Sequence, residues 1–161
     1  MIFPATGEVS FTDGLHIAAH ASADELPELL TLGAEATRAL PIEGWKQVAL
    51  GEHFSEHGVF EVEVTVGFQG LVEAVFLSHE HSFYRPGPDD DEERRIFHEG
   101  VIATDLRGQR EFRWGNVFCR FDRTTKRDWL VVIYTSFAGV TLSDREVLEV
   151  LFAHEPIPEE S

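Results

Sequence analysis

The sequence lacks the features that define several large classes of protein. It has one cysteine, Cys119, in 161 residues, so no disulfide can form within the chain and a reducing compartment is expected. No stretch approaches the roughly 18 uninterrupted apolar residues that a membrane-spanning helix needs. The start, MIFPATGEVSF, has no basic segment followed by an apolar one, as a secretory signal would. These absences predict a cytoplasmic protein that does not enter a membrane.

Motifs for nucleotide, redox and serine-hydrolase chemistry are missing as well. There is no G-x-G-x-x-G, no Walker loop and no C-x-x-C. Ser78 lies beside His79 but has no G-x-S-x-G context, and no third partner can be identified. Cys119 lies in an apolar run between Phe118 and Phe121, which is typical of a buried core thiol.

Basic residues are scarce, with 13 Lys and Arg against 29 Asp and Glu, and the net charge is −16. Residues 1–84 carry −11, residues 85–127 carry +1 and residues 128–161 carry −6. Such a surface repels phosphate backbones, so nucleic acid is not an expected partner. The arginines between positions 107 and 127 are the only candidates for phosphate contact, and neutralising the acidic remainder of the domain is the simpler role for them.

The length and the apolar pattern predict one α+β domain spanning residues 1–161. GEVSFTDGLHIAAH predicts two short strands around the turn dipeptide Asp13-Gly14. Apolar and polar residues alternate over 58–68, which predicts a strand, and GLVEAVFLSHEHSFY after it predicts a hairpin that turns at 68–70. The segment 101–137 predicts a three-stranded meander with turns near 107–108 and 124–126.

Three helices are expected around these strands. Capping-box spacing and an apolar face predict a helix over 23–39. A short middle helix follows Pro88, with acids first and arginines later, and ends at Gly100. Ser143 and Glu146 have capping-box spacing at the start of a C-terminal helix that ends before Pro156. The predicted architecture is a curved, mostly antiparallel sheet of about six to eight strands with these three helices.

The segment SHEHSFY, residues 78–84, raises the question of a metal site. His79 and His81 share one face of a strand because residues two apart point to the same side. Setting Val66 opposite Val72 closes an apolar face, and residue numbers that face each other then sum to 138. In this register His81 lies opposite His57.

Three imidazoles and a water are a common ligand set for catalytic zinc. His57, His79 and His81 are therefore the predicted zinc ligands, with Glu56, Glu80 or His53 as outer partners. The competing interpretation, a polar strand end without a ligand, is the favoured one, because eight histidines in a chain of this length produce close pairs by chance. A further possibility is acid–base chemistry by carboxylates on one sheet face, although alternating glutamates are typical of a solvated strand. The carboxylates concerned are those of Glu61, Glu63 and Glu73.

The segment RGQREFRWGNVFCRF interleaves arginines with aromatic residues. Such a pattern can stack on the bases of single-stranded nucleic acid, but Trp, Phe and Arg are also the residues that anchor protein interfaces. The interface candidates are Arg110, Arg113, Trp114 and Arg120.

These observations favour a noncatalytic acidic binding protein that recognises a basic protein partner, as immunity proteins and inhibitors do by analogy of charge. One alternative is a small metal-dependent hydrolase that uses the histidine cluster. The other is a sheet pocket for a small apolar ligand, lined by Trp45, Trp114 or Trp129.

Overall fold

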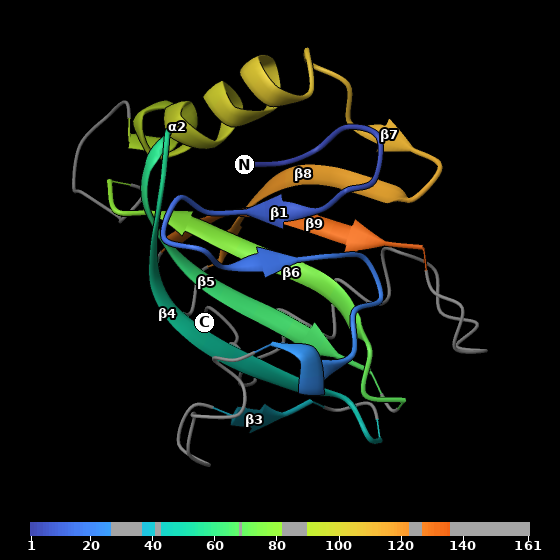
Figure 1. Cartoon of the computed structure of the whole chain (residues 1–161). Coiled ribbons are helices and arrows are strands. Elements are labelled where there is room, and N and C mark those ends of the chain that lie inside the picture. Colours follow the sequence, from blue (N-terminus) through green and yellow to red (C-terminus); the bar gives the residue numbers. More distant parts are fainter. Residues whose placement is uncertain (27–36, 41–42, 68, 82–89, 123–126, 136–161) are drawn as a thin grey trace, which may run out of the picture.

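A curved antiparallel sheet of seven strands forms the centre of the structure, in the order β3-β4-β5-β6-β9-β8-β7 (Figure 1). This computed structural model describes residues 1–26, 37–40, 43–67, 69–81, 90–122 and 127–135. The strands are β3 (Thr37–Ala39), β4 (Lys46–Ser55), β5 (Gly58–Val66), β6 (Val72–His79), β7 (Glu111–Phe112), β8 (Gly115–Asp122) and β9 (Arg127–Tyr134). The pairing of β6 with β9 joins the two halves of the chain.

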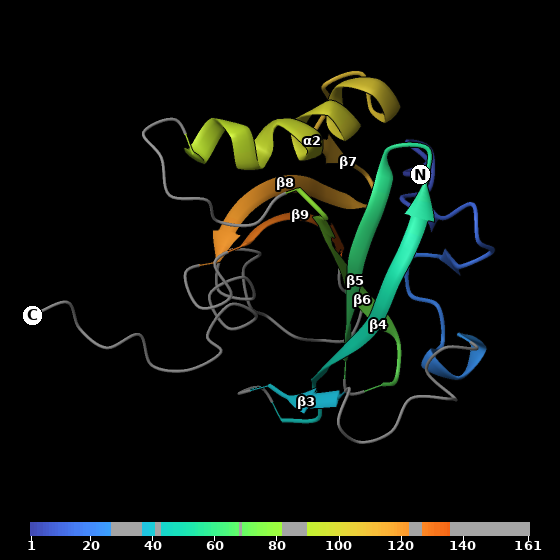
Figure 2. The same cartoon turned by 90° about the vertical axis from the view of Figure 1, so that its left-hand side faces the viewer.

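One face of this sheet, called the helix face below, is covered by the helix α2 (Asp90–Asp105) and by the N-terminal segment (Figure 2). The N-terminal segment contains β1 (Val9–Ser10), β2 (His16–Ile17) and the short 3-10 helix η1 (Ala23–Glu25). The helix packs over β8 and β9. Apolar side chains from α2, β1 and β2, and Leu26 directly after η1, meet the sheet in one core cluster.

The strand β5 shows how the alternating pattern divides the two faces. Phe60, Val62 and Val64 are fully buried on the helix face, while Glu61 and Glu63 point to the opposite face. Every residue of β6 is buried. Side chains on both faces of this central strand therefore belong to the hydrophobic core, which explains its nearly continuous apolar sequence.

The opposite face has an apolar cluster of its own. The seven buried residues in it come from β6, β9 and the β3–β4 connection, and Phe118 packs against them. They are Leu40, Trp45, Ala74, Phe76, Trp129, Val131 and Ile133.

Several predicted elements are confirmed. The two short strands around Asp13-Gly14 pair antiparallel, with Val9 opposite Ile17, and Gly14 has the positive φ of +103° that such a turn uses. The long strand begins at Gly58 as predicted, and β6 follows it after a tight turn. The class of the fold, α+β with a mostly antiparallel sheet, is also confirmed.

The predicted register of the β5–β6 hairpin is wrong beyond its first pair. Val66 does lie opposite Val72, but the register then shifts by one residue, so Val64 faces Val75. The shift falls between the pairs Thr65–Ala74 and Val66–Val72, where Glu73 is an extra residue of β6 and forms a bulge. His79 consequently lies opposite Phe60, and the sum of facing numbers is 139 instead of 138.

The middle helix is longer than predicted. It continues through Gly100 to Asp105, and the residues at 101–105 that were expected to begin a meander are its last turns. His98, Val101 and Ile102 are buried at the spacing i, i+3, i+4, which is a helical period that outweighs the β-branched character of Val and Ile. The meander has its first strand at β7 instead.

The predicted helix over 23–39 is wrong at its C-terminal end. Thr37–Ala39 form β3, where Thr37 pairs with Val48 of β4, so a tertiary partner overrides the helical pattern. Residues 27–36 and the predicted C-terminal helix over 143–155 lie outside the described residues. Within the described residues, no helix is long and apolar enough to span a membrane.

Candidate functional site

His79, the centre of the predicted zinc site, is a buried residue held by two backbone groups. Its Nε2 lies 2.9 Å from the carbonyl oxygen of His57, and its Nδ1 accepts the N–H of His81 at 3.1 Å. The ring stacks on Phe97 with centroids 4.1 Å apart and meets Phe60 edge-on at 5.1 Å. Because Nδ1 is an acceptor, Nε2 carries the proton and the imidazole is neutral.

Burial, as the largest cause, lowers the pKa of His79 from its ordinary value, and the nearby imidazoles act in the same direction. The hydrogen bond to the carbonyl of His57 opposes the shift without cancelling it. A metal ion could reach His79 only by displacing one of its two backbone partners. The hydrogen bonds of the His79 ring therefore join the start of β5 to the end of β6.

His57 and His81 have other partners. His57 Nε2 lies 2.9 Å from Oδ1 of Asp105, at the end of α2, and the other carboxylate oxygen of Asp105 accepts the N–H of Ile2 at 3.0 Å. His81 is about half exposed, with Nε2 3.3 Å from Glu80. Zinc binding by His57, His79 and His81 stays a prediction.

Glu56, His57 and Asp105 do bring three potential ligand atoms within 4.8 Å of one another. The amino group of Met1 already lies 3.2 Å from Glu56 and 3.8 Å from Asp105. A positive charge thus balances these carboxylates. His53, the other predicted outer partner, bonds to Asp13 at 3.1 Å.

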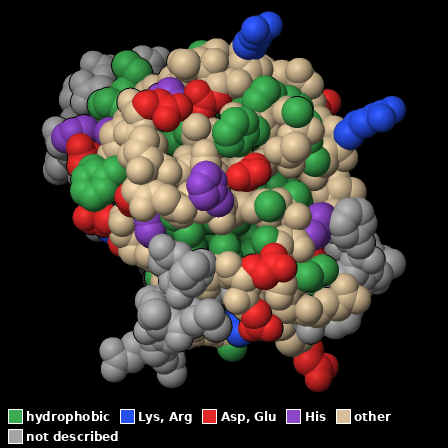
Figure 3. Space-filling view, in the orientation of Figure 1, with side chains coloured by type: hydrophobic (Ala, Val, Ile, Leu, Met, Phe, Trp, Pro, Cys, Tyr) green, Lys and Arg blue, Asp and Glu red, His purple; other side chains and the backbone are tan. Residues whose placement is uncertain are grey.

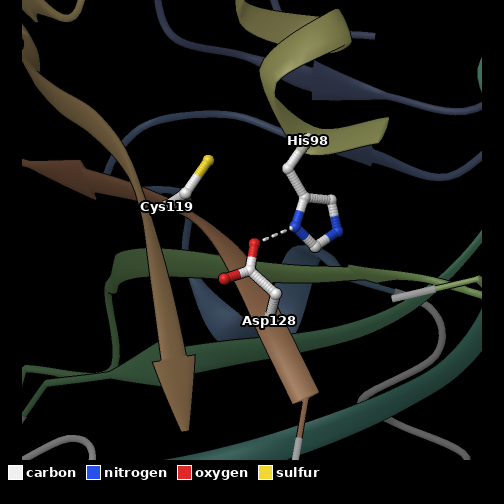
Figure 4. A group of neighbouring side chains, drawn as sticks. All are labelled: His98, Cys119 and Asp128. Atoms are coloured by element: carbon white, nitrogen blue, oxygen red, sulfur yellow. Dashed lines mark hydrogen bonds and ion pairs between the residues drawn. The ribbon is translucent and has the colours of Figure 1, made fainter. Parts of the chain in front are cut away.

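A group that sequence reasoning missed consists of the buried His98 and Asp128 and the half-buried Cys119 (Figure 4). His98 donates from Nδ1 to Asp128 at 2.8 Å and accepts the N–H of His79 on Nε2 at 2.9 Å. Arg95 donates from Nε and Nη2 to the other oxygen of Asp128, at 3.1 and 3.0 Å. This network ties α2 to β6 and β9.

Cys119 stays a neutral thiol in this group. Burial raises its pKa to about 12, and the carboxylates of Glu99 and Asp128 add to the effect. A thiol nucleophile needs a lowered pKa and a base aimed at its sulfur, but both nitrogens of His98 already have partners. The network is therefore suited to holding the fold together. Its signal in the sequence was the helical spacing of His98 with Val101 and Ile102.

The predicted interface residues do not form one patch. Arg110 pairs with Glu99 of α2, Arg113 is exposed in the β7–β8 turn, and Trp114 donates from Nε1 to the carbonyl of Pro4 at 2.9 Å. Arg120 is on the opposite face of β8, since Cys119 next to it packs on the helix face.

The tryptophans proposed to line a ligand pocket pack within the protein. Trp45 and Trp129 belong to the buried cluster on the opposite face. Trp114 packs so closely against Gly7 that a Cβ there would lie 2.5 Å from the indole. The predicted carboxylate row is also divided, because Glu73 is buried on the helix face, away from Glu61 and Glu63.

The surface that the N-terminal segment presents carries scattered acidic and histidine side chains, with basic side chains mainly at its margins (Figure 3). No protein-family model matches this chain. No curated protein matches its sequence. Its fold is similar to that of a chain in the solved structure of Rhs1-CT in complex with cognate immunity protein RhsI1, with a TM-score of 0.52 and 12% identity, covering 92% of this chain and 93% of that chain. At this identity the likeness concerns the fold alone.

Proposed function

We propose that the chain is a binding protein of the immunity kind, which recognises and neutralises a basic partner protein. The observation that carries the proposal is a net charge of −16 on a fold that also occurs in the structure of Rhs1-CT in complex with its cognate immunity protein. Complementary charge speeds the encounter of two proteins and favours the right partner over others.

The interior polar groups support a binding role over a catalytic one. His79, His98 and Asp128 are buried and bonded to one another or to the backbone, and Cys119 has a raised pKa. Catalytic groups need a perturbed pKa together with access to a substrate. These residues instead join α2 to the strands of the sheet. We therefore assign the function to side chains on the surface. The same proposal includes a cytoplasmic location, which agrees with the single cysteine.

The experiment is a test of neutralisation. The tag-free chain is immobilised, proteins of the source organism are bound at low salt, and each specific partner is identified and expressed alone in a bacterial host. We expect a basic protein that stops growth when expressed alone, and normal growth when this chain is expressed with it. A partner that is harmless alone, or growth that co-expression does not restore, would contradict the proposal.

A further inference from the structure

We infer that the basic partner binds at the end of the β4–β5 hairpin on the opposite face of the sheet, by laying an arginine side chain on the ring of Phe54. This inference rests on the proposed function for the kind of partner. The Phe54 surface, as it is called below, consists of Glu52, Phe54, Val59, Glu61 and Glu80.

Phe54 is the centre of this surface. Its side chain is 57% exposed, although Phe is normally a core residue. Phe54 lies directly opposite Val59 of β5, and the N–H of Glu80 bonds to the carbonyl of Val59 at 3.0 Å. Phe54 of β4, Val59 of β5 and Glu80, the first residue after β6, therefore form one row, about 5 Å apart from one to the next.

Three glutamates occupy positions of the sheet close to Phe54. Glu52 is exposed and lies two residues from Phe54 on the same side of β4. It faces Glu61 of β5 directly, and two like charges in this position repel each other. The side chains of Glu61 and Glu80 are 41% and 46% exposed.

The positive groups nearby only partly balance these charges. Arg127 pairs with Glu61 and also feels the charge of Glu52. His81 lies 3.3 Å from Glu80. Among the described residues, three carboxylates thus face one guanidinium, and the remaining negative charge is available to a cationic partner. Arg120 is on this face too, but it lies opposite Trp129, three strands away from Glu61.

The position of Phe54 is fixed before a partner arrives. Its N–H donates to the carboxylate of Asp13 at 3.1 Å, and its carbonyl accepts from the N–H and hydroxyl of Thr12 at 2.8 and 3.0 Å. These bonds use the backbone groups on the outer edge of β4, so a partner strand cannot pair with them. A rigid aromatic side chain costs little entropy on binding.

Arginine is the side chain that suits this arrangement. Its planar guanidinium stacks on aromatic rings and binds carboxylates through two parallel hydrogen bonds. On the ring of Phe54 it would lie between Glu52 and Glu80. Lysine has the same charge but no planar group to stack on the ring and no pair of parallel N–H donors. The Phe54 surface should therefore bind arginine more tightly than lysine.

The first test uses a defined probe and needs no natural partner. A capped hexa-arginine peptide is titrated into the ¹⁵N-labelled chain, with hexa-lysine as the control of equal charge. We expect amide shifts concentrated at residues 52–61 and 80, weaker binding of hexa-lysine, and at least fivefold weaker hexa-arginine binding in Phe54→Ala. Phe3→Ala is the matched control, because Phe3 is 49% exposed in the N-terminal segment. It should bind like wild type.

Several results would overturn the inference. They are shifts spread over the whole acidic surface, equal binding of the two peptides, unchanged binding by Phe54→Ala, and shifts at 52–61 that appear with protein concentration alone and so indicate a second copy of the chain.

The second test uses a partner confirmed by the growth experiment. Phe54→Ala and Glu52→Lys should each weaken that complex at least tenfold, while Phe3→Ala leaves it unchanged. A partner that binds all variants equally would remove the Phe54 surface but keep the proposed function. Hexa-arginine binding at Phe54 without any neutralised toxin would keep the surface and remove the immunity role.

Discussion

The backbone N–H of His79 donates a hydrogen bond to Nε2 of His98 at 2.9 Å, and this bond decides where the proton of His98 lies. Since Nε2 accepts, Nδ1 must carry the hydrogen that Asp128 receives. One imidazole thereby connects three elements that are distant in sequence, namely β6, α2 and β9. The end of β6, which the sequence suggested as a metal site, instead helps to hold α2 against the sheet.

Removing the carboxylate of Asp128 should strongly destabilise the protein. Asp128→Ala leaves the buried His98 without its acceptor and removes the carboxylate partner of the partly exposed Arg95. We expect the free energy of unfolding to fall by about 2–4 kcal/mol. Urea denaturation measures the change. Glu99→Gln is the control, because its pair with Arg110 is exposed on both sides and should change stability by less than about 1 kcal/mol. Similar losses in the two variants would refute the structural role of Asp128.

A side chain at Gly58 should destabilise the protein because Gly58 lies close to His79. A Cβ at Gly58, where φ is +113°, would lie 2.6 Å from Nε2 of His79. Gly51 has φ +80° and no neighbour within 4 Å of its Cβ position, so Gly51→Ala has only the backbone cost of about 1–2 kcal/mol. We expect Gly58→Ala to lose about 1–3 kcal/mol more in urea denaturation, since the hydrogen bond of a buried group is disturbed.

A double variant separates the effect of the contact with His79 from the effect of backbone strain at Gly58. In a His79→Ala background the extra cost of Gly58→Ala should disappear, because the atom in conflict is gone. An undiminished extra cost would show that the closeness to His79 has no energetic effect. Zinc titration of wild type and His79→Ala tests at the same time whether His79 is a zinc ligand. If it is, wild type shows saturable zinc binding that the variant lacks.

Stability should fall as the pH drops below about the ordinary pKa of histidine. Burial lowers the pKa of His79 and of His20 in the folded state from 6.5. The unfolded chain therefore binds more protons just below that pH, and folding becomes less favourable there. The contribution of both residues is complete above pH 6.5 and is lost as the pH falls toward their folded-state values.

Urea denaturation at pH 7.5 and 5.5 checks this effect. We expect wild type to be less stable at pH 5.5, and His79→Gln to show a smaller difference between the two pH values. His81→Gln is the control, because His81 is about half exposed. A larger difference in His79→Gln than in wild type would contradict the assignment.

Cys119 should react slowly with thiol reagents in the folded protein. With its pKa raised to about 12, the thiolate fraction at pH 8 is on the order of a thousandfold below that of an ordinary cysteine. Alkylation by iodoacetamide, followed by mass spectrometry, should be at least about 100-fold slower than in urea-unfolded protein. Rapid alkylation of the native chain would return Cys119 to consideration as a nucleophile.

Association with the partner should depend steeply on salt. If opposite charge guides the encounter, the association rate falls as ionic strength rises, while the dissociation rate changes less. Stopped-flow or surface-based kinetics over a range of salt concentrations would measure both rates. An association rate independent of salt would argue against electrostatic recognition and in favour of an interface dominated by apolar contact.

The β5–β6 hairpin illustrates what a pattern can and cannot predict. The alternation over β5 identified the strand and its buried side, because a period of two is a local property. The register was missed because β6 is buried on both faces, so apolar residues oppose β5 in either register. The bulge at Glu73 of β6, which decides between the two registers, has no mark in the sequence.

The sequence by itself determined the β5–β6 hairpin, the two short N-terminal strands and the negative charge, since these follow from neighbouring residues and from totals. It did not determine β3 and β4, whose pairing depends on tertiary contacts. Only the tertiary structure decided what the histidines do. A neutral imidazole can bind a metal, accept a backbone N–H or donate to a carboxylate, and the choice depends on which groups reach its two nitrogens. For His57 and His98 those groups include carboxylates 48 and 30 residues away. Contacts at such a distance along the chain arise only when the strands and helix are packed together.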